Sequence, residues 1–328
     1  MKILVTGGLG FIGSNFILKI LNEYESFEII NVDDELTGSN INNVSEIQDN
    51  QKYEFVKGNI TNRRLMEELI SKCDCVVNFA AESFVDRSIN DANPFLVSNI
   101  QGAFTILDIV TRQKKRMVQI STDEVFGSLL EGTATEQSKF NPSSPYAATK
   151  AAAELLVNSY FITHNSDVII TRCTNNYGPK QFIEKLIPKT IILANMNKKI
   201  PIYGNGENIR DWMYVDDHCN GVILSLLKGK SGQSYNISSN NEIDNISVVK
   251  KILEIMGKNN DLMEFVDDRP GHDFRYSMDS TKISKELEWK INSNFEQGLN
   301  RTIEWYLNNS KLADSGSTSA LKATPWKD

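Results

Sequence analysis

Residues 2–13 read KILVTGGLGFIG, and this stretch decides the fold. Residues 2–6 are a short apolar, β-branched run that favours a buried strand. The glycines Gly7, Gly10 and Gly13 follow at once, and residues 14–21 then show helical periodicity. A strand, a glycine turn and a helix in this order are typical of a loop that binds a dinucleotide pyrophosphate. Backbone N–H groups can approach the phosphates there, and the helix N-terminus adds partial positive charge.

A carboxylate lies at the distance expected for a dinucleotide site. Asp33 ends the second predicted strand, residues 27–32, and comes 20 residues after Gly13. A carboxylate with this spacing accepts hydrogen bonds from the adenosine ribose. Because it would repel a 2′-phosphate, the sequence favours NAD over NADP.

Strands and helices alternate over the first half of the chain. Further strands are predicted over residues 53–56, 75–79, 117–120 and 168–171, with helices over 63–70, 94–110 and 145–161. This alternation predicts an α/β fold, a Rossmann-like doubly wound parallel sheet that binds ligands at the carboxyl ends of its strands. After about Gly178 the pattern loosens and predicts a smaller C-terminal α/β substrate domain. We expect an NAD-binding domain over 1–178, to which residues 213–238 return, a nucleotide-sugar-binding domain over 179–309, and a flexible tail over 310–328.

Composition excludes several classes of function. Lys and Arg total 35 and Asp and Glu total 42 in 328 residues, so the net charge is −7. An acidic chain has no electrostatic footprint for nucleic acid or an anionic membrane. The four Cys and three His have neither disulfide nor metal-site spacing. We therefore expect a cytoplasmic protein with reduced thiols and no metal.

Tyr146 and Lys150 form a Y-x-x-x-K pair in PYAATKAAAELL, a strong helix former after Pro145. The i, i+4 spacing places both side chains on one helical face. A tyrosine ordinarily has a pKa near 10, so a phenolate near neutrality needs a positive charge beside it. Ser121 and Thr122 end a strand upstream, where a hydroxyl can assist the same base. The glycine loop, the acid, the Ser/Thr pair and Y-x-x-x-K together indicate an enzyme.

The chain resembles the extended short-chain dehydrogenase/reductase family, and within it the dTDP-glucose 4,6-dehydratase branch. The matching pieces include LVTGGLGFIGSN (4–15), NFAAES (78–83), STDEVFG (121–127), PYAATKAAAE (145–154), NNYGP (175–179), GNGENIRDWMYVDDH (204–218) and DRPGHDFRY (268–276). STDEV is the most specific of them. The resemblance implies a lyase with bound NAD that converts dTDP-glucose, or a related nucleotide-diphosphate hexose, to the 4-keto-6-deoxy sugar.

The resemblance also implies catalytic roles. Tyr146, supported by Lys150, takes the O4 proton while the C4 hydride passes to NAD⁺, and Thr122 binds near O4. Glu124 then removes the C5 proton, and protonated Asp123 donates to the leaving O6 hydroxyl. A straight strand would point Asp123 and Glu124 to opposite faces, so these roles predict a bend at the end of the strand.

The remaining site residues are likewise implied by the resemblance. The cofactor-binding set comprises Gly7, Gly10, Phe11, Ile12, Gly13, Asp33, Asn59, Ile60, Ala80, Ala81, Ser83, Asn99, Tyr146, Lys150 and Asn176. The substrate-binding set comprises Asn175, Lys185, Leu186, Pro201, Tyr203, Arg210, Asn245, Arg269 and His272. Two arginines suit the diphosphate, because a planar guanidinium matches phosphate oxygens.

One departure from the family and several alternatives stay open. Phe84 replaces the histidine usual after A-A-E-S, and an aromatic ring cannot hydrogen-bond a sugar hydroxyl, which leaves the base and the hexose open. A sugar-nucleotide 4-epimerase and a non-catalytic dinucleotide-binding protein use the same scaffold. The family further implies a homodimer built through the helices at 94–110 and 146–161, although a core face would explain the same apolar residues.

Overall fold

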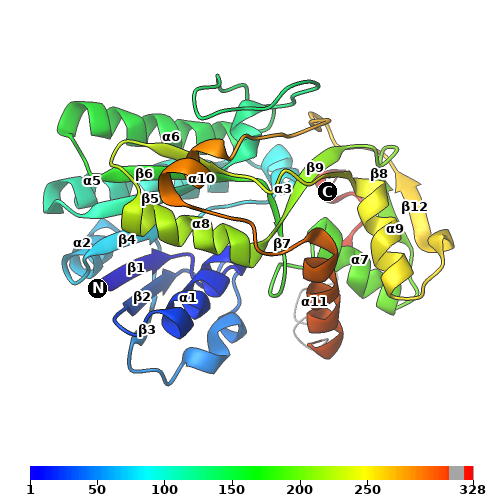
Figure 1. The fold of residues 1–328 in the computed structure, drawn as a ribbon, viewed down its shortest axis with the longest axis horizontal. Helices are drawn as coiled ribbons and strands as arrows, with labels where there is room; N and C mark the ends of the chain where they lie inside the picture. The colour runs from blue at the N-terminus through cyan, green and yellow to red at the C-terminus, as the bar shows by residue number, and fades with distance from the viewer. Residues whose placement is uncertain (310–320, 328) are drawn as a thin grey trace.

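The structure is a computed structural model and describes residues 1–309 and 321–327. Its main sheet has seven strands in the order β10-β6-β5-β4-β1-β2-β3, and every neighbouring pair is parallel (Figure 1). The strands are β1 (Lys2–Thr6), β2 (Glu28–Asp33), β3 (Tyr53–Lys57), β4 (Cys75–Asn78), β5 (Arg116–Thr122), β6 (Val168–Cys173) and β10 (Ser234–Ile237). The prediction of a Rossmann-like parallel sheet is confirmed.

Helices cover both faces of this sheet, which is why its strands read as almost continuous apolar runs. In β1, Ile3 and Val5 point into the core on one face, whereas Leu4 points into the core on the other. The first face carries α1 (Phe11–Glu23), α8 (Val215–Lys228) and α10 (Thr281–Leu287); the second carries α2 (Arg63–Ser71), α5 (Ala103–Gln113) and α6 (Pro145–His164) (Figure 1).

The order of the strands reverses between β1 and β4. The chain runs outward from β1 through β2 to β3, and then crosses to β4 on the other side of β1. At such a switch point the loops that follow the two central strands diverge and leave a crevice at their carboxyl ends. The glycine loop follows β1 and residues 79–83 follow β4, so both border this crevice.

The C-terminal part of the chain forms two small sheets backed by helices (Figure 1). One sheet joins β11 (Glu242–Asp244), β9 (Ile209–Tyr214) and β7 (Asn175–Tyr177), and the other pairs β12 (Met263–Val266) with β8 (Ile200–Tyr203). The helices are α7 (Leu186–Asn195), α9 (Asn245–Ile255) and α11 (Phe295–Asn308). Their apolar faces meet in cores separate from those of the main sheet.

The chain crosses between the two parts more than once. After β7, β8 and β9 it returns to the main sheet, where α8 packs against α1 and β10 pairs with β6 to become the edge strand. These contacts support the proposal that residues 213–238 belong with the NAD-binding domain. The boundary near 178 between this domain and the substrate domain, and the boundary near 309 before the tail, likewise stay proposals.

The helix predicted over 94–110 is longer and less regular. It spans α4 (Asn93–Phe95), a π-helical turn (Leu96–Gly102) and α5. Among the described residues, 93–113 is the one helical stretch long and apolar enough to cross a membrane, and half of it is buried inside the protein. Because it packs against α2 and α6, this stretch has the contacts of a core helix.

Part of the predicted flexible tail is instead placed against the protein. Residues 321–327 contain a 3₁₀ turn (Pro325–Lys327) that contacts α3 (Val85–Asn90), and the side chain of Trp326 is buried. In the structure the buried Trp326 and hydrogen bonds from Asn90 and Lys189 hold these residues against the protein, whereas the flexibility of the tail stays a prediction. The rest of the tail, 310–320 and 328, lies outside the described residues.

Candidate active site and cofactor cavity

The glycine loop is built for close backbone contact. Gly7 has a φ of +69°, and a Cβ there would lie 2.7 Å from backbone atoms of Ala80. A Cβ on Gly13 would lie 2.4 Å from the carbonyl oxygen of Gly7, so both positions need glycine. Helix α1 begins at Phe11 without a side-chain cap. Its first N–H groups have no acceptor within the helix and can therefore receive phosphate oxygens.

Asp33 lies at the end of β2 and braces this loop. Its Oδ2 accepts a hydrogen bond from the Leu9 backbone N–H at 3.0 Å, and its Oδ1 accepts one from the Glu35 N–H at 2.9 Å. Burial raises the pKa of this carboxyl above its ordinary value. Asp33 thus shapes the glycine loop, and a carboxylate oxygen has lone pairs left for a ribose hydroxyl.

A cavity of about 700 Å³ extends from this loop along the carboxyl edge of the sheet. It brings together all of the predicted catalytic residues and nearly all of the predicted cofactor residues. The predicted residues that line it are Gly7, Gly10, Phe11, Ile12, Gly13, Asp33, Asn59, Ile60, Ala80, Ala81, Ser83, Thr122, Asp123, Glu124, Tyr146, Lys150, Asn175, Asn176 and Lys185.

Two predicted cofactor residues have other partners. Asn99 is buried and does not line the cavity; its amide bonds the backbone N–H and carbonyl of Glu82 and donates to the Thr149 hydroxyl. It therefore holds the segment after β4. Asn59 does line the cavity, but its Oδ1 accepts hydrogen bonds from the N–H and hydroxyl of Thr61. An adenine amino group would compete with Thr61 for that oxygen.

The carboxyl pair lies just after β5, where the predicted bend is present. The strand ends at Thr122, and a 3₁₀ turn begins at Asp123 with the Thr122 side chain as its cap. Asp123 is buried, and burial together with the Glu124 charge raises its pKa to about 8. Burial also raises the pKa of Glu124, while the cations of Arg269, Lys185 and Arg210 act against it. At neutral pH the pair can therefore hold one protonated and one ionised carboxyl.

Tyr146 and Lys150 lie in the first two turns of α6, whose cap is Ser144. The Lys150 ammonium donates to the Ile120 carbonyl oxygen at 2.6 Å, and burial lowers the pKa of Lys150 to about 8. Burial raises the pKa of Tyr146 well above its ordinary value, Glu124 adds to this, and a hydrogen bond with Thr122 opposes it. Within the chain alone Tyr146 is a neutral phenol, so it needs an additional positive charge to act as a base.

A second cavity, of about 170 Å³, adjoins the first. All nine predicted substrate residues line it: Asn175, Lys185, Leu186, Pro201, Tyr203, Arg210, Asn245, Arg269 and His272. The two cavities share Phe84, Glu124, Asn175, Asn176, Gln181 and Lys185. A ligand in the second cavity thus reaches Glu124, and the first cavity borders both Glu124 and Asp123.

Asp86 organises the second cavity and was not predicted. One of its oxygens accepts a hydrogen bond from the Tyr203 hydroxyl at 3.1 Å, and the other accepts one from Arg269 at 2.7 Å. Asp86 lies on α3, whereas its two partners come from the C-terminal part of the chain. Its place after residues 78–83 in a matching piece of sequence was the available signal.

Tyr276 was also missed. Its hydroxyl lies 2.8 Å from Asp273 Oδ2 and 3.4 Å from Glu124 Oε2, and the Arg210 guanidinium stacks 4.3 Å from the centre of its ring. Arg210 itself donates to the carbonyl oxygen of Asp273 at 2.9 Å. Tyr276 therefore contacts both Glu124, the candidate base, and Arg210, a candidate phosphate-binding residue. It is the last residue of the matching piece DRPGHDFRY, which was the available signal.

Phe84, the departure from the family pattern, lies where the two cavities meet. Its ring is buried, stacks edge to face on Phe182 at 5.4 Å, and has the Lys185 ammonium 4.9 Å from its centre. Lys185 also donates to the carbonyl oxygen of Ser83 at 3.0 Å. The aromatic ring thus positions a cation at the entrance to the carboxyl pair instead of offering a hydrogen bond.

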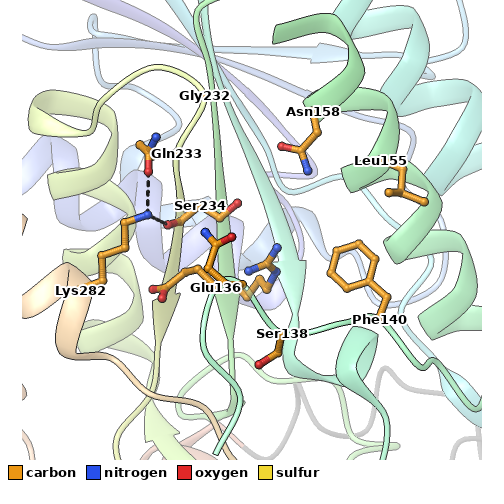
Figure 2. A pocket seen from close by; sticks show the side chains of 11 residues that line it. Glu136, Ser138, Phe140, Leu155, Asn158, Gly232, Gln233, Ser234 and Lys282 are labelled. Atoms are coloured by element: carbon orange, nitrogen blue, oxygen red, sulfur yellow. Dashed lines mark hydrogen bonds between the residues drawn. The ribbon is translucent and has the colours of Figure 1, made fainter. Parts of the chain in front are cut away.

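A third hollow, of about 360 Å³, lies away from this site at the outer edge of the main sheet (Figure 2). Lys282 there donates to the side chain of Gln233 and to the carbonyl oxygen of Ser234 (Figure 2). Arg172, which also lines the hollow, is paired with the carboxylate of Glu154. None of the predicted site residues lines this hollow.

The two adjoining cavities are lined by the residues that the sequence resemblance implied, and a comparison with known families supports that resemblance. The profile of the GDP-mannose 4,6 dehydratase family matches residues 4–302. The chain belongs to this family. A curated dTDP-glucose 4,6-dehydratase from Haemophilus influenzae is 46% identical to it, with 94% of this chain and 99% of the relative covered.

Solved structures of relatives have the same fold. A dTDP-glucose 4,6-dehydratase from Bacillus anthracis, solved with NAD, has a TM-score of 0.91 and 44% identity, with 98% of this chain and all of that chain covered. One from Streptomyces venezuelae, also with NAD, has a TM-score of 0.94, 39% identity and the same coverage. A UDP-glucuronic acid 4-epimerase from Bacillus cereus is more distant, with a TM-score of 0.89 and 26% identity over 94% of this chain.

The lining of the first cavity fits a dinucleotide. Several buried polar atoms there have no partner among the described residues: Ser121 Oγ, Asp123 Oδ2, Thr174 Oγ1, Asn176 Oδ1 and Gln181 Oε1. Buried polar groups in proteins are almost always hydrogen-bonded, so these atoms mark where a polar ligand belongs. They lie toward the Tyr146 end, where a nicotinamide amide could use them.

Proposed function

We propose that the protein is a nucleotide-sugar 4,6-dehydratase that acts on dTDP-glucose or a closely related nucleotide-diphosphate hexose. The adjacent carboxyls of buried Asp123 and half-buried Glu124, beside Tyr146 and Lys150, carry this proposal. An enzyme that only oxidises and reduces C4 needs the tyrosine, but it has no use for two adjacent carboxyls in unlike states. The dehydratase relatives at 39 to 46% identity support the same function.

The proton steps follow from where the side chains lie. Tyr146 takes the O4 proton, with the buried Lys150 ammonium behind it and Thr122 beside it. Glu124 removes the C5 proton, which is acidic once C4 is a ketone; burial raises the pKa of Glu124, and the neighbouring cations of Arg269, Lys185 and Arg210 oppose that shift. Asp123, protonated at neutral pH, donates its proton to the departing O6 hydroxyl, which leaves as water. Glu124 has then gained the C5 proton and Asp123 has lost one, so the pair still holds a single proton.

We propose NAD as the cofactor, held by the glycine loop, Asp33 and the residues after β4. Bound there, the cofactor would supply the acceptor for the C4 hydride and the donor of the hydride that reaches C6. The positive charge of its oxidised ring would also lower the pKa of the buried Tyr146 hydroxyl. This would oppose the effect of burial, which raises that pKa in the protein without cofactor.

A product assay tests this function. The protein is incubated with dTDP-glucose and with UDP-glucose in parallel, and the alkaline absorbance of a 4-keto-6-deoxy sugar is followed. Substrate with deuterium at C4 should give product with deuterium in the new methyl group. A 4-keto product without deuterium in the methyl group contradicts the transfer of hydride from C4 to C6. If neither sugar gives a product, the result favours the alternative of a non-catalytic dinucleotide-binding protein.

The 4-epimerase alternative is separated by one substitution. Glu124→Gln should abolish the exchange of the C5 proton with solvent in a dehydratase, because the base is gone. A 4-epimerase leaves C5 untouched and would keep its activity. NMR of the sugar in deuterated water reads C5 directly, and Tyr146→Phe, which should stop both reactions, is the matched control.

We also propose that the protein is a homodimer. Large apolar side chains are exposed on the helices that follow residue 93: Leu96, Val97, Phe104, Leu155 and Ile162. Ile162 is 79% exposed, α5 and α6 pack side by side, and exposed apolar side chains on neighbouring helices are typical of an interface. Leu155→Lys with Ile162→Lys should halve the mass measured by light scattering. The four buried cysteines, all unpaired, suit the reducing cytoplasm in which we place it.

A further inference from the structure

We propose that the C-terminal segment, residues 321–327, supports the wall of the substrate cavity from behind, with Trp326 as the residue that positions Tyr203. This inference rests on the proposed function for the nature of the ligand. The segment lies outside residues 4–302, which the family profile matches, so it adds to the framework that the family shares.

Trp326 packs directly on a cavity residue. Its ring centre lies 4.6 Å from that of Tyr203, with the planes at 79°, an edge-to-face contact. Trp326 is 8% exposed. A large aromatic side chain contributes strongly to packing when it is buried in this way, so the contact holds the segment against Tyr203.

Tyr203 is thereby held at both ends. Its hydroxyl donates to Asp86 Oδ2 at 3.1 Å, and its ring rests against Trp326. The ring also borders the second cavity, together with Pro201 and His272. Without Trp326 the ring would keep its hydroxyl bond to Asp86 and a longer edge contact with His272 at 6.4 Å, and part of the cost of ordering it would fall on the binding of substrate.

The segment also connects the two sides of the cavity. Asn90 on α3 donates to the carbonyl oxygen of Pro325 at 3.1 Å, and Lys189 on α7 donates to that of Lys322 at 3.1 Å. Lys189 is buried and lines the same cavity, so the segment provides an acceptor for a buried ammonium there. Helix α3 carries Asp86 and α7 belongs to the C-terminal part, and the segment spans from one to the other.

The reacting groups are elsewhere. Asp123, Glu124, Tyr146 and Lys150 lie at the carboxyl edge of the main sheet, and none of them has a contact with residues 321–327 among the described interactions. Loss of Trp326 should therefore weaken the binding of the nucleotide sugar and leave the chemical step intact. In steady-state kinetics this is a rise in KM with little change in kcat.

The test compares Trp326→Ala and Trp326→Phe in the NAD-loaded enzyme, with Trp305→Ala as a control that removes a tryptophan stacked on Tyr306. With the better of dTDP-glucose and UDP-glucose, Trp326→Ala should raise KM about tenfold and change kcat less than about twofold. Trp326→Phe should have a KM close to the wild-type value, because a phenyl ring can make the same edge contact with Tyr203. Trp305→Ala should leave KM at the wild-type value.

Three results would overturn the inference: an unchanged KM in Trp326→Ala, a lower kcat at constant KM, or a lower KM, which would mean that the segment obstructs the cavity. A wild-type enzyme that forms no 4-keto product from either sugar contradicts the proposed function instead. Calorimetric binding of dTDP to the wild type and to Trp326→Ala then decides on the segment by itself, since the contact with Tyr203 does not depend on turnover.

Discussion

The Thr122 hydroxyl donates a hydrogen bond to Asp123 Oδ1 at 3.0 Å, while Asp123 Oδ2 has no partner among the described residues. One oxygen is thus fixed from the end of β5, and the other is left for a proton that can be delivered. Burial and the neighbouring Glu124 keep that proton in place, because they raise the pKa of Asp123 to about 8.

Asp123→Asn should slow the elimination of water. An asparagine has nearly the same shape and cannot transfer a proton, so kcat should fall about 10³-fold, in the range for loss of a general acid. Oxidation at C4 should survive, and the absorbance of the reduced cofactor should accumulate after mixing in a stopped-flow instrument. Asp49→Asn, at an exposed position, serves as the control. An Asp123→Asn enzyme with wild-type kcat would remove Asp123 from the reaction.

Activity should fall as the pH rises through about 8. Asp123 must be protonated and Lys150 must be charged, and burial places both pKa values at about 8. With two protons lost, the slope of log kcat against pH should approach about −2 in the wild type and about −1 in Asp123→Asn. Equal slopes in the two enzymes would show that Asp123 does not titrate in this range.

The buried His218 should make the protein labile in mild acid. Its ring is fully buried, neither ring nitrogen has a partner among the described residues, and burial lowers the pKa to about 3. Because the folded-state pKa is lowered, the unfolded chain gains a proton below pH about 6.5 that the folded chain does not, so stability falls with decreasing pH.

At pH about 5 the loss attributable to His218 should be about 2 kcal/mol relative to neutrality. Urea unfolding of the wild type and His218→Met at both pH values measures it, and the variant should lose less stability between them. His164→Gln, at an exposed site on α6, should behave like the wild type. Identical pH dependence in His218→Met and the wild type would contradict the assignment.

Glu154→Ala should destabilise the fold strongly. Arg172 and Glu154 are 2% and 0% exposed and joined by a bidentate contact, with guanidinium–carboxylate distances of 2.6 to 3.0 Å. Removing the carboxylate leaves a buried cation without its partner, at a cost of about 3–5 kcal/mol. Thermal unfolding measures this, and Glu68→Ala, which breaks the exposed pair with Lys72, should leave the midpoint unchanged. A small loss in Glu154→Ala would mean that water reaches Arg172 from the hollow at the sheet edge.

Local sequence signals predicted most of the fold and of the cavity lining. The strands of the main sheet are buried on both faces, so they consist of short runs of apolar residues that can be recognised in the sequence. The loop after β1 has steric requirements that only glycine meets. Other features depended on distant contacts. Asp86 acquires its role by meeting Tyr203 and Arg269, which lie more than 100 residues away, and Trp326 has no neighbouring pattern that would announce where it docks.

The return of the chain to the main sheet has a consequence for how the protein assembles. Strand β10 covers the edge of β6, and α8 supplies Val215, Cys219, Val222, Ile223 and Leu226 to the core beside α1. In a nascent polypeptide that has emerged only as far as Gly178, the edge of β6 is therefore unpaired. The apolar side chains of α1 and β1 on this face then lack the helix α8 that covers them in the complete fold. The core on this face also includes Ile283 and Leu287 of α10, so folding of the dinucleotide-binding half is complete only after synthesis has passed residue 287, and a fragment cut at 178 should not fold by itself.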